Sequence, residues 1–126
     1  MQANTINLTL PYPPSANRYW RSVVNKKTGR AMVFVSEEAK QFKRDVKVLV
    51  HRAIKDTLIV GEISLTARFF RPQRSGDLSN RIKVLEDAMQ GLVYADDKQI
   101  VEIHASRHED KLNPRVEVEI VALGLC

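Results

Sequence analysis

The sequence predicts a single α+β domain over residues 1–126, with a mixed β-sheet and two main helices packed on one of its faces. Two segments carry apolar residues at helical spacing, and four others alternate apolar and polar residues in the manner of half-buried strands. The predicted strands come before, between and after the helices along the chain. Packing both helices on one face of the sheet is the simplest way to bury the apolar faces of the helices and the sheet. At 126 residues and 44% hydrophobic, the chain can build one core and is too short for two domains of ordinary size.

The N-terminal part is expected to form a strand, a long loop and a short strand. Residues 6–10 alternate, and the prolines of PYPP end this strand because they donate few ladder hydrogen bonds. Residues 11–30 then form a loop rich in aromatic and basic residues, with a turn at Thr28 and Gly29 before a short apolar strand at 32–35. A loop of this length in a small domain usually has a binding role or its own packing.

A long amphipathic helix is expected over residues 36–56. Ser36 suits the N-cap position, and Glu37 and Glu38 place acids in the first turn, where the helix dipole favours them. An apolar stripe follows at helical spacing, and four cations lie outside it. The stripe consists of Ala39, Phe42, Val46, Leu49, Val50 and Ala53, and the cations are Lys40, Lys43, Arg44 and Lys47.

The second half is expected to form a strand, a helix and a hairpin. Alternation returns over residues 59–70, and the basic turn RPQRSG leads to a helix at 77–91 that ends at Gly91. After the loop VYADDKQ, residues 100–107 and 116–123 alternate on either side of HEDKLNP, which predicts an antiparallel hairpin. The strand buries Ile63, Leu65, Ala67 and Phe69, and the helix carries an apolar stripe of Leu78, Ile82, Leu85, Met89 and Leu92.

Positive charge is concentrated in the first two thirds of the chain. The net charge is +5, with 11 Lys and Arg against 4 acids over residues 18–56 and 5 against 1 over residues 68–83. From residue 84 onward the balance reverses, with 4 against 9. Such a chain can present a phosphate-binding face, which makes nucleic acid a reasonable partner. Charge alone leaves a solvated surface with an accidental bias equally open.

Composition argues against several other classes. No apolar run approaches the roughly 20 residues that a membrane-spanning helix needs. The start MQANTINLTL lacks the basic stretch and apolar core of a secretory signal, and the lone Cys126 can close no intrachain disulfide. The five glycines do not cluster into a phosphate-cradling loop. We therefore expect a soluble protein of the reducing cytoplasm, with no membrane partner and no small-molecule cofactor.

The candidates for chemistry are acids of the second helix and of the loop after it. Asp77 stands where the helix begins, Lys83 lies opposite its apolar stripe, and Asp96 and Asp97 follow in the loop. Taken singly, they are explained as an N-cap, a solvated lysine and turn formers. If they converge at one end of the sheet, carboxylates this close favour a cation, and Mg²⁺ is the natural one. Beside a DNA phosphate it can polarise the phosphoryl oxygen and orient a water, while Lys83 stabilises developing charge.

The three histidines are weaker signals. His104 and His108 can share a strand face, but no zinc spacing accompanies them, which favours surface or partner-facing roles. His51 is expected on a helix surface. No Ser, His and Asp triad follows from these positions.

Two stretches resemble the RusA family of Holliday junction resolvases, which phages and prophages often encode. The specific one, RSGDLSNRIKVLEDAMQGLVYADDKQIVE, is similar to a family pattern of Asp-x-Asp-Asn, a lysine one turn later, a helical acid and a closing Asp-Asp before a strand. LPYPPSANRYW is a second, independent match. The resemblance covers nearly the whole chain and implies a RusA-like fold.

The resemblance implies roles for individual residues. Asp77, Lys83 and Asp97 would be catalytic, and Asp77, Asp96 and Asp97 would bind the metal; Asp87 also falls on a matching position. It further implies a homodimer that binds branched DNA, the four-way junction, and makes paired, ligatable nicks with Mg²⁺. The residues expected to contact DNA are Asn17, Arg18, Lys26, Lys27, Arg30, Arg71, Arg74 and Asn80.

Ser79 departs from the family pattern, because it stands where the pattern has its second aspartate. A neutral hydroxyl is a poorer magnesium ligand and removes one negative charge. An engineered inactivating change, a natural variant that no longer cuts, and a site in which Asp96, Asp87 or a water substitutes are all open. We predict that DNA binding survives and that cleavage is much reduced. A junction-binding protein without catalysis is therefore a second hypothesis, and a general interaction module that uses PYPP and the aromatic loop is a third.

Overall fold

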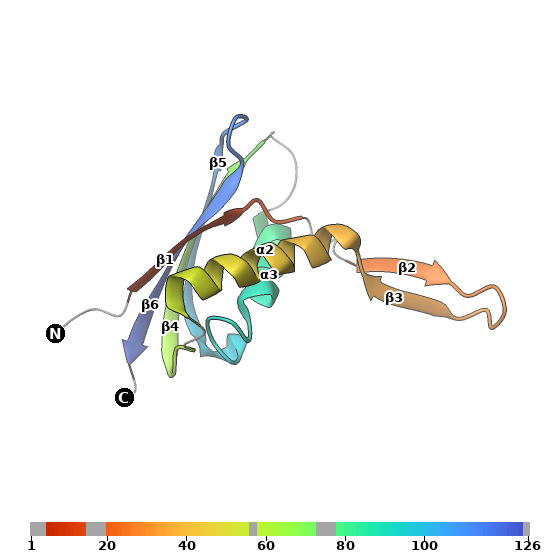
Figure 1. The fold of residues 1–126 in the computed structure, drawn as a ribbon, viewed down its shortest axis with the longest axis horizontal. Coiled ribbons are helices and arrows are strands. Elements are labelled where there is room, and N and C mark those ends of the chain that lie inside the picture. The colour runs from red at the N-terminus through yellow and green to blue at the C-terminus, as the bar shows by residue number, and fades with distance from the viewer. Residues whose placement is uncertain (1–4, 15–19, 56–57, 73–77, 125–126) are drawn as a thin grey trace.

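The structure, a computed structural model, describes residues 5–14, 20–55, 58–72 and 78–124. The elements follow the expected order, with an additional strand in the first third and a short 3-10 helix before β5 (Figure 1). In chain order they are β1 Thr5–Pro11, β2 Trp20–Val24, β3 Ala31–Val35, α2 Glu37–Ile54, β4 Glu62–Arg71, α3 Leu78–Met89, η1 Asp97–Gln99, β5 Ile100–Glu109 and β6 Arg115–Gly124.

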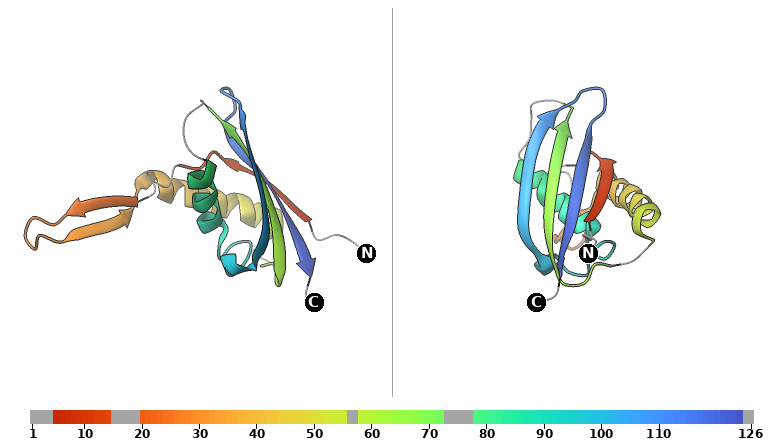
Figure 2. Two further views of the ribbon diagram at one scale, coloured as in Figure 1. Left: turned by 180° about the vertical axis from the view of Figure 1, so that it is seen from behind. Right: turned by 90° about the vertical axis from the view of Figure 1, so that its left-hand side faces the viewer.

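Four strands form one mixed sheet in the order β1-β6-β4-β5. β6 runs antiparallel to both β1 and β4, whereas β5 runs parallel to β4. The predicted mixed sheet is confirmed, but the prediction that the last two strands pair as a hairpin is wrong. β4 lies between them, and the residues that join β5 to β6 cross its end, where the Asp110 amide donates to the Arg71 carbonyl at 2.8 Å (Figure 2). A strand as apolar as β4 is best buried between two neighbours.

Both main helices pack on the same face of the sheet, as predicted (Figure 2). α2 lies against β1 and α3, and α3 reaches across toward β5. The predicted apolar face of β4 is fully buried beneath them. The core also takes Val116, Val118 and Ile120 from β6, and Leu85 and Met89 from the predicted stripe of α3.

The helix ends are fixed by local signals in the sequence. Ser36 caps α2 as predicted, because its hydroxyl oxygen accepts from the Ala39 amide at 3.2 Å. α2 ends at Ile54, and its C-cap Lys55 adopts a left-handed conformation with φ 53°. Ala53 in the last turn is exposed, so its predicted place in the apolar stripe was wrong. Gly91 follows α3 with φ 85°, the conformation for which a glycine is suited at a helix end.

The first part of the chain departs most from the sequence expectation. Residues 20–24 do not belong to a long loop but form β2, which pairs antiparallel with β3 in a separate two-stranded sheet. Figure 1 shows this hairpin extending away from the body of the molecule. The aromatic and basic composition obscured the strand, because β2 carries none of the alternation that a half-buried strand shows.

Asn25 organises the turn of this hairpin. Its side-chain oxygen accepts from the Lys27 amide at 2.9 Å and from the Thr28 amide at 3.4 Å, while its backbone amide donates to the Arg30 carbonyl at 2.8 Å. Gly29 closes the turn with φ 70°. The chain from Lys26 to Arg30 is exposed, so the hairpin presents a basic tip on a defined turn.

Among the helices of the described chain, none has the length and apolar character needed to cross a lipid bilayer.

Candidate functional site

The exposed face of α3 carries polar and charged residues. Ser79 and Lys83 are exposed, and Asn80 and Asp87 are half-buried. Lys83 Nζ lies 3.9 Å from Asp87 Oδ1, one helical turn further on. The Lys83 side chain keeps 62% of its exposure in this pair, so its ammonium group is available to a ligand that approaches the helix.

The Asp96-Asp97 loop forms a capped 3-10 turn. Asp96 is the N-cap of η1, and its carboxylate accepts from the Lys98 amide at 2.9 Å. This hydrogen bond lowers the pKa of the Asp96 carboxyl. The plain interpretation of Asp96 as a turn former therefore describes what its carboxylate does in the structure. Asp97 is the first residue of η1 and is half-buried.

Gln99 fastens this turn to the start of β4. Its side-chain oxygen accepts from the amides of Ala95 and Asp96 at 2.9 and 3.1 Å. Its side-chain nitrogen donates to the carbonyls of Ile59 and Gly61, each at 2.9 Å. One side chain thus joins the loop after α3 to the strand below it and fixes the backbone from which Asp97 projects.

Charged groups of α3 and η1 converge around Glu86. Burial raises the pKa of the Glu86 carboxyl, Lys83 opposes that shift, and the charges of Asp97 and Asp87 add to it. The Tyr94 hydroxyl responds to the same group, because burial and then the carboxylates of Glu86, Asp97 and Asp87 raise its pKa. Asp97 is thus close enough to α3 to share an electrostatic environment with Lys83.

Sequence reasoning missed Glu86, Tyr94 and Gln99. Glu86 was detectable, because it follows Lys83 by three residues and therefore shares its helix face. Tyr94 looked like a loop residue, but it is fully buried and its hydroxyl donates to the Glu86 carbonyl at 2.8 Å. The role of Gln99 depends on contacts with residues about 40 positions earlier, so no local signal indicated it.

Several predicted site residues lie outside the described part of the chain. These are Asp77 and, among the expected DNA contacts, Asn17, Arg18 and Arg74. Within the described residues, no group of three or more His, Cys, Asp or Glu side chains is close enough to hold a metal ion. The acids of α3 and η1 are therefore neighbours in the electrostatic sense and do not by themselves form a three-ligand cage.

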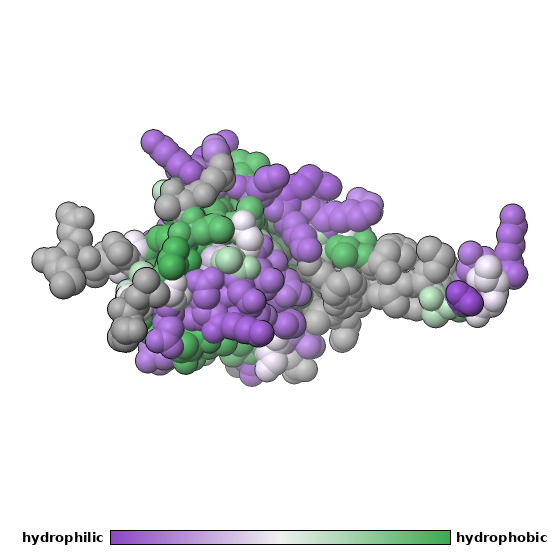
Figure 3. All heavy atoms as spheres, turned by 90° about the horizontal axis from the view of Figure 1, so that it is seen from below, coloured by the Kyte–Doolittle hydropathy of each residue, from purple (hydrophilic) through white to green (hydrophobic). Residues whose placement is uncertain are grey.

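The predicted basic contacts occupy two separate places. Lys26, Lys27 and Arg30 are exposed at the tip of the β2–β3 hairpin, where Figure 3 shows hydrophilic side chains at the far end of the molecule. Arg71 stands at the end of β4, and its guanidinium is 3.4 Å from Glu109 Oε1. Its side chain is only 11% exposed, so Arg71 is mainly a structural ion-pair partner in this structure.

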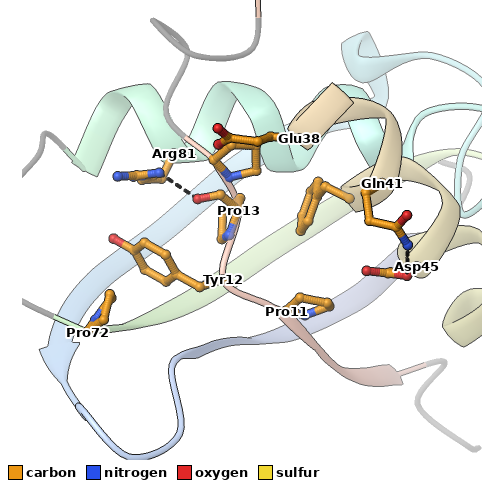
Figure 4. A pocket seen from close by; sticks show the side chains of 10 residues that line it. Pro11, Tyr12, Pro13, Glu38, Gln41, Asp45, Pro72 and Arg81 are labelled. Carbon is orange, nitrogen blue, oxygen red and sulfur yellow. Dashed lines mark hydrogen bonds between the residues drawn. The ribbon is translucent and has the colours of Figure 1, made fainter. Parts of the chain in front are cut away.

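PYPP lines a pocket of about 500 Å³ between the end of β1 and the two helices (Figure 4). Arg81 of α3 holds this segment, because its guanidinium donates to the Pro13 carbonyl at 2.6 Å and lies 4.8 Å from the centre of the Tyr12 ring. Gln41 and Asp45 of α2 form the opposite side and are hydrogen-bonded to each other. PYPP therefore anchors the chain to α3 before the hairpin begins.

His104 and His108 lie on the sheet face away from the helices. Their partners in the register are Thr66 and Phe70 of β4, which alternate with its buried residues. The His108 ring stacks on Phe70 with 5.0 Å between centroids, and His104 lies 4.0 Å from Glu102. Both are exposed, which agrees with the surface role expected for them, and His51 is likewise exposed on α2.

Comparison with known proteins gives a consistent result. Residues 11–121 match the family described as Endodeoxyribonuclease RusA. The crossover junction endodeoxyribonuclease RusA of Escherichia coli strain K12 is 28% identical over 123 residues, which are 96% of this chain and 98% of that protein. The protein of the same description from Enterobacteria phage 82 is 27% identical over 123 residues, which are 96% of this chain and 98% of that protein.

Proposed function

The chain belongs to the RusA family of Holliday junction resolvases, and from this premise we propose that it binds four-way DNA junctions as a homodimer and hydrolyses phosphodiester bonds in a Mg²⁺-dependent reaction. The cuts are paired nicks on symmetric strands, placed by the two copies of the site. Ser79 reduces the rate of cleavage and leaves junction binding in place. A substrate of this kind places the reaction where branched DNA arises, in recombination and repair in the cytoplasm.

The feature that supports this proposal is the electrostatic influence of Asp97 on Glu86 of α3. Asp97, Asp87 and Lys83 all act on the Glu86 carboxyl, although Asp97 follows a separate turn about ten residues later. Functional sites are where carboxylates are held together with incomplete charge compensation. Asp77 precedes the first residue of α3 directly, so this face begins one position after it.

The donor chemistry of this face fits Mg²⁺. Magnesium is usually held by one or two carboxylates together with waters and substrate phosphate oxygens, so it needs no cage of three protein ligands. We assign Asp77 and Asp97 as its ligands, with Asp96 adjacent and holding the turn. When bound, the ion supplies a Lewis acid for the scissile phosphate and lowers the pKa of a water.

Lys83 and Asn80 act directly on the DNA phosphate in this proposal. The Lys83 ammonium group stabilises the negative charge that grows on the phosphoryl oxygens as the water attacks and the P–O bond breaks. Asp87 keeps that ammonium group above the helix face through their 3.9 Å pair. Asn80 lies three residues before Lys83, on the same face, and its amide group can donate to a phosphate oxygen.

The tip of the β2–β3 hairpin provides a second set of contacts with the DNA. Lys26, Lys27 and Arg30 stand on an extension remote from α3, so they bind the phosphates of a duplex arm away from the cut (Figure 1). Contacts of this kind contribute affinity and salt dependence without reading sequence. We place Asn17, Arg18 and Arg74 in the same backbone contacts.

The test is a Mg²⁺ titration with a synthetic four-way junction and a linear duplex of the same sequence. The expected result is junction-selective binding, slow paired nicking that requires the metal, and a nicking rate that rises at least about 10-fold in Ser79→Asp, because a second carboxylate restores a magnesium ligand. Ser79→Ala is the matched control, and it should leave the slow rate unchanged. Equal nicking rates in the natural chain and Ser79→Asp would contradict the assigned role of Ser79.

Ser79 also favours a second candidate, a junction-binding protein without catalysis. In that case binding is tight and insensitive to Mg²⁺, and neither the natural chain nor Ser79→Asp nicks the junction. Equal binding to junction and linear duplex would contradict both candidates and return the protein to the class of general nucleic-acid modules.

A further inference from the structure

The solvent-facing side of α2 carries four cations to which the proposed function gives no role. Lys40, Lys43, Arg44 and Lys47 follow one another at spacings of three, one and three residues, and all four are exposed. An α-helix advances about 100° per residue, so side chains at these spacings share one face. The four extend over about 11 Å along the helix axis. We call these four side chains the α2 track.

The acids of α2 leave most of this positive charge uncompensated. Glu38 and Asp45 line the PYPP pocket, so they lie on a different face of the helix. Glu37 pairs with Lys40 at 3.4 Å, but the two side chains keep 84% and 50% of their exposure, and an ion pair as open to water as this is weak. Within the described parts of the chain, no hydrogen bond or ion pair engages the Lys47 side chain. The α2 track therefore presents its charge to the solvent.

The arginines on the outer face of the sheet differ from the α2 track because they are paired. Arg68 lies 3.6 Å from Glu117, and Arg115 pairs with both Asp110 and Glu117. The apolar side of α2 is itself buried in the core, so this helix cannot insert into a lipid surface as an amphipathic membrane helix does. A polyanion that lies along the helix is therefore the partner that the α2 track fits.

The position of α2 relates the track to the two regions already assigned to DNA. β3 ends at Val35 and α2 begins at Glu37, so the track starts where the hairpin ends. Figure 1 shows the hairpin and α2 following one another along the length of the molecule, and α2 also packs against α3. One strand of duplex DNA carries a phosphate about every 3.4 Å along its axis, so the track matches about three successive phosphates.

We propose that the α2 track binds the DNA backbone of the same duplex arm that the hairpin tip holds, and so continues that contact toward α3. The inference rests on the proposed function, because it takes branched DNA as the substrate. Ammonium and guanidinium groups bind phosphate oxygens through charge-assisted hydrogen bonds that do not depend on base sequence. Contacts at the tip and along the track together fix the direction of one arm relative to α3, which a single point of contact cannot do.

The salt dependence of junction binding tests the track. Binding is measured in EDTA, so that no nicking is needed. Each lysine that contacts a phosphate contributes about 0.9 to the slope of log K against log salt concentration, so Lys47→Gln should lower the slope by about 0.9 and Lys43→Gln with Lys47→Gln by about 1.8. At about 150 mM salt, Lys47→Gln alone should weaken binding by about 5-fold. The losses should be equal for two junctions with different arm sequences.

Two control variants separate the track from charge in general and from the stability of α2. Lys111→Gln removes the same charge from the turn between β5 and β6, and Val48→Gln replaces a neutral residue of α2 that is 49% exposed. Both should keep the slope of the natural chain. An unchanged slope in the double variant, or an equal loss in Lys111→Gln, would overturn the track and leave the proposed function intact. Equal binding of the natural chain to junction and linear duplex would instead overturn the proposed function on which the track rests.

A tethered iron–EDTA chelate tests the path of the arm in a Cys126→Ser background. The chelate is attached through Lys27→Cys at the hairpin tip or through Lys47→Cys in the track, and its hydroxyl radicals cleave the nearest DNA backbone. Cleavage from position 47 should fall on the same arm as cleavage from position 27 and closer to the branch point. Cleavage on a different arm, or none from position 47 while position 27 cleaves, would overturn the continuous path.

Discussion

Two charged regions of this small protein differ in how far cations balance their acidic side chains. At the turn between β5 and β6, Arg115 pairs with Asp110 at 2.9 Å and with Glu117 at 3.1 Å, and its guanidinium stacks 3.9 Å from the centre of the Phe70 ring. At the face of α3 and η1, Lys83 is the cation that acts on Glu86, while Asp97 and Asp87 oppose it. The first region compensates its acids, and the second leaves a surplus.

The pKa shifts in the two regions have opposite signs, and burial is the largest cause of the shift at Glu86. The hydrogen bond from Arg115 lowers the pKa of the Asp110 carboxyl. At the other region, burial and the neighbouring acids raise the pKa of the Glu86 carboxyl against the effect of Lys83. Compensated acids stabilise a fold, whereas uncompensated acids cost stability and persist where a ligand or reaction uses them. The comparison therefore separates a structural cluster from the candidate functional one within a single domain.

The largest expected effect comes from replacing Lys83, the cation of the α3 face, with alanine. Lys83→Ala should lower cleavage by about 10²–10³-fold, because it removes the group that stabilises charge on the phosphate, and should leave junction affinity within about 3-fold. The measurement is single-turnover nicking in the Ser79→Asp background with Mg²⁺. Lys111→Ala, in the exposed turn after β5, is the matched control and should cut normally. Equal rates in the two variants would remove Lys83 from the chemistry.

The next effect concerns how the surplus acids are held in place. Gln99→Ala removes hydrogen bonds to Ala95, Asp96, Ile59 and Gly61, so it should cost about 2 kcal/mol in the free energy of unfolding and lower cleavage by about 10-fold. Urea unfolding and single-turnover nicking measure the two losses.

Gln99→Glu sharpens the interpretation of that experiment. Glutamate keeps the acceptor for the amides of Ala95 and Asp96 and loses the donor toward Ile59 and Gly61. Because the new carboxylate oxygen faces two carbonyl oxygens that are also acceptors, the stability of Gln99→Glu should be no higher than that of Gln99→Ala. Full cleavage in Gln99→Ala would show that the position of Asp97 does not depend on this anchor.

Arg115→Ala should lower stability and leave cleavage unchanged, which is the reverse of Lys83→Ala. It removes the shared partner of Asp110 and Glu117, so the Tm should fall by more than in Lys83→Ala, whose longer ion pair at 3.9 Å is more exposed. Cleavage by the folded variant should be unchanged. A loss of cleavage at temperatures where Arg115→Ala is folded would contradict the separation of a structural from a functional cluster.

The sequence predicted the parts of this fold that depend on local pattern. The apolar face of β4, the stripe of α3 and the Ser36 cap follow from residue spacing and capping chemistry, and the structure confirms them. The insertion of β4 between β5 and β6 was missed, because alternation identifies a strand without naming its neighbour. β2 was missed because its stability comes from pairing with β3 outside the main core.

In the candidate site, too, the sequence predicted the features that depend on local spacing and missed those that depend on contacts between elements. Lys83 was placed opposite the apolar stripe by its spacing, and it is exposed there in an ion pair with Asp87. Glu86, Tyr94 and Gln99 were not identified, because their roles depend on burial and on contacts between separate elements. The assignments of Asp77 and Asp97 as ligands stay predictions, since Asp77 lies outside the described residues.

The smallest expected effect is a pH dependence of stability with opposite signs in the two regions. Because the pKa of Asp110 is lowered, its carboxylate stabilises the fold above its ordinary pKa, and that contribution is lost as pH falls through the lowered value. Because the pKa of Glu86 is raised above 4.5, its ionised form destabilises the fold, and the penalty grows as pH rises from 4.5 through the raised value.

Variants that replace each carboxyl group with a neutral amide measure these opposite pH dependences. Asp110→Asn should lose stability relative to the natural chain at pH 6, and this difference should shrink toward pH 3. Glu86→Gln should gain stability at pH 7 and lose that gain near pH 4. Thermal unfolding from pH 3 to pH 8 without Mg²⁺ gives both curves. Parallel curves would mean that Glu86 is as well compensated as Asp110, and the surplus of negative charge that distinguishes the α3 face would then not exist.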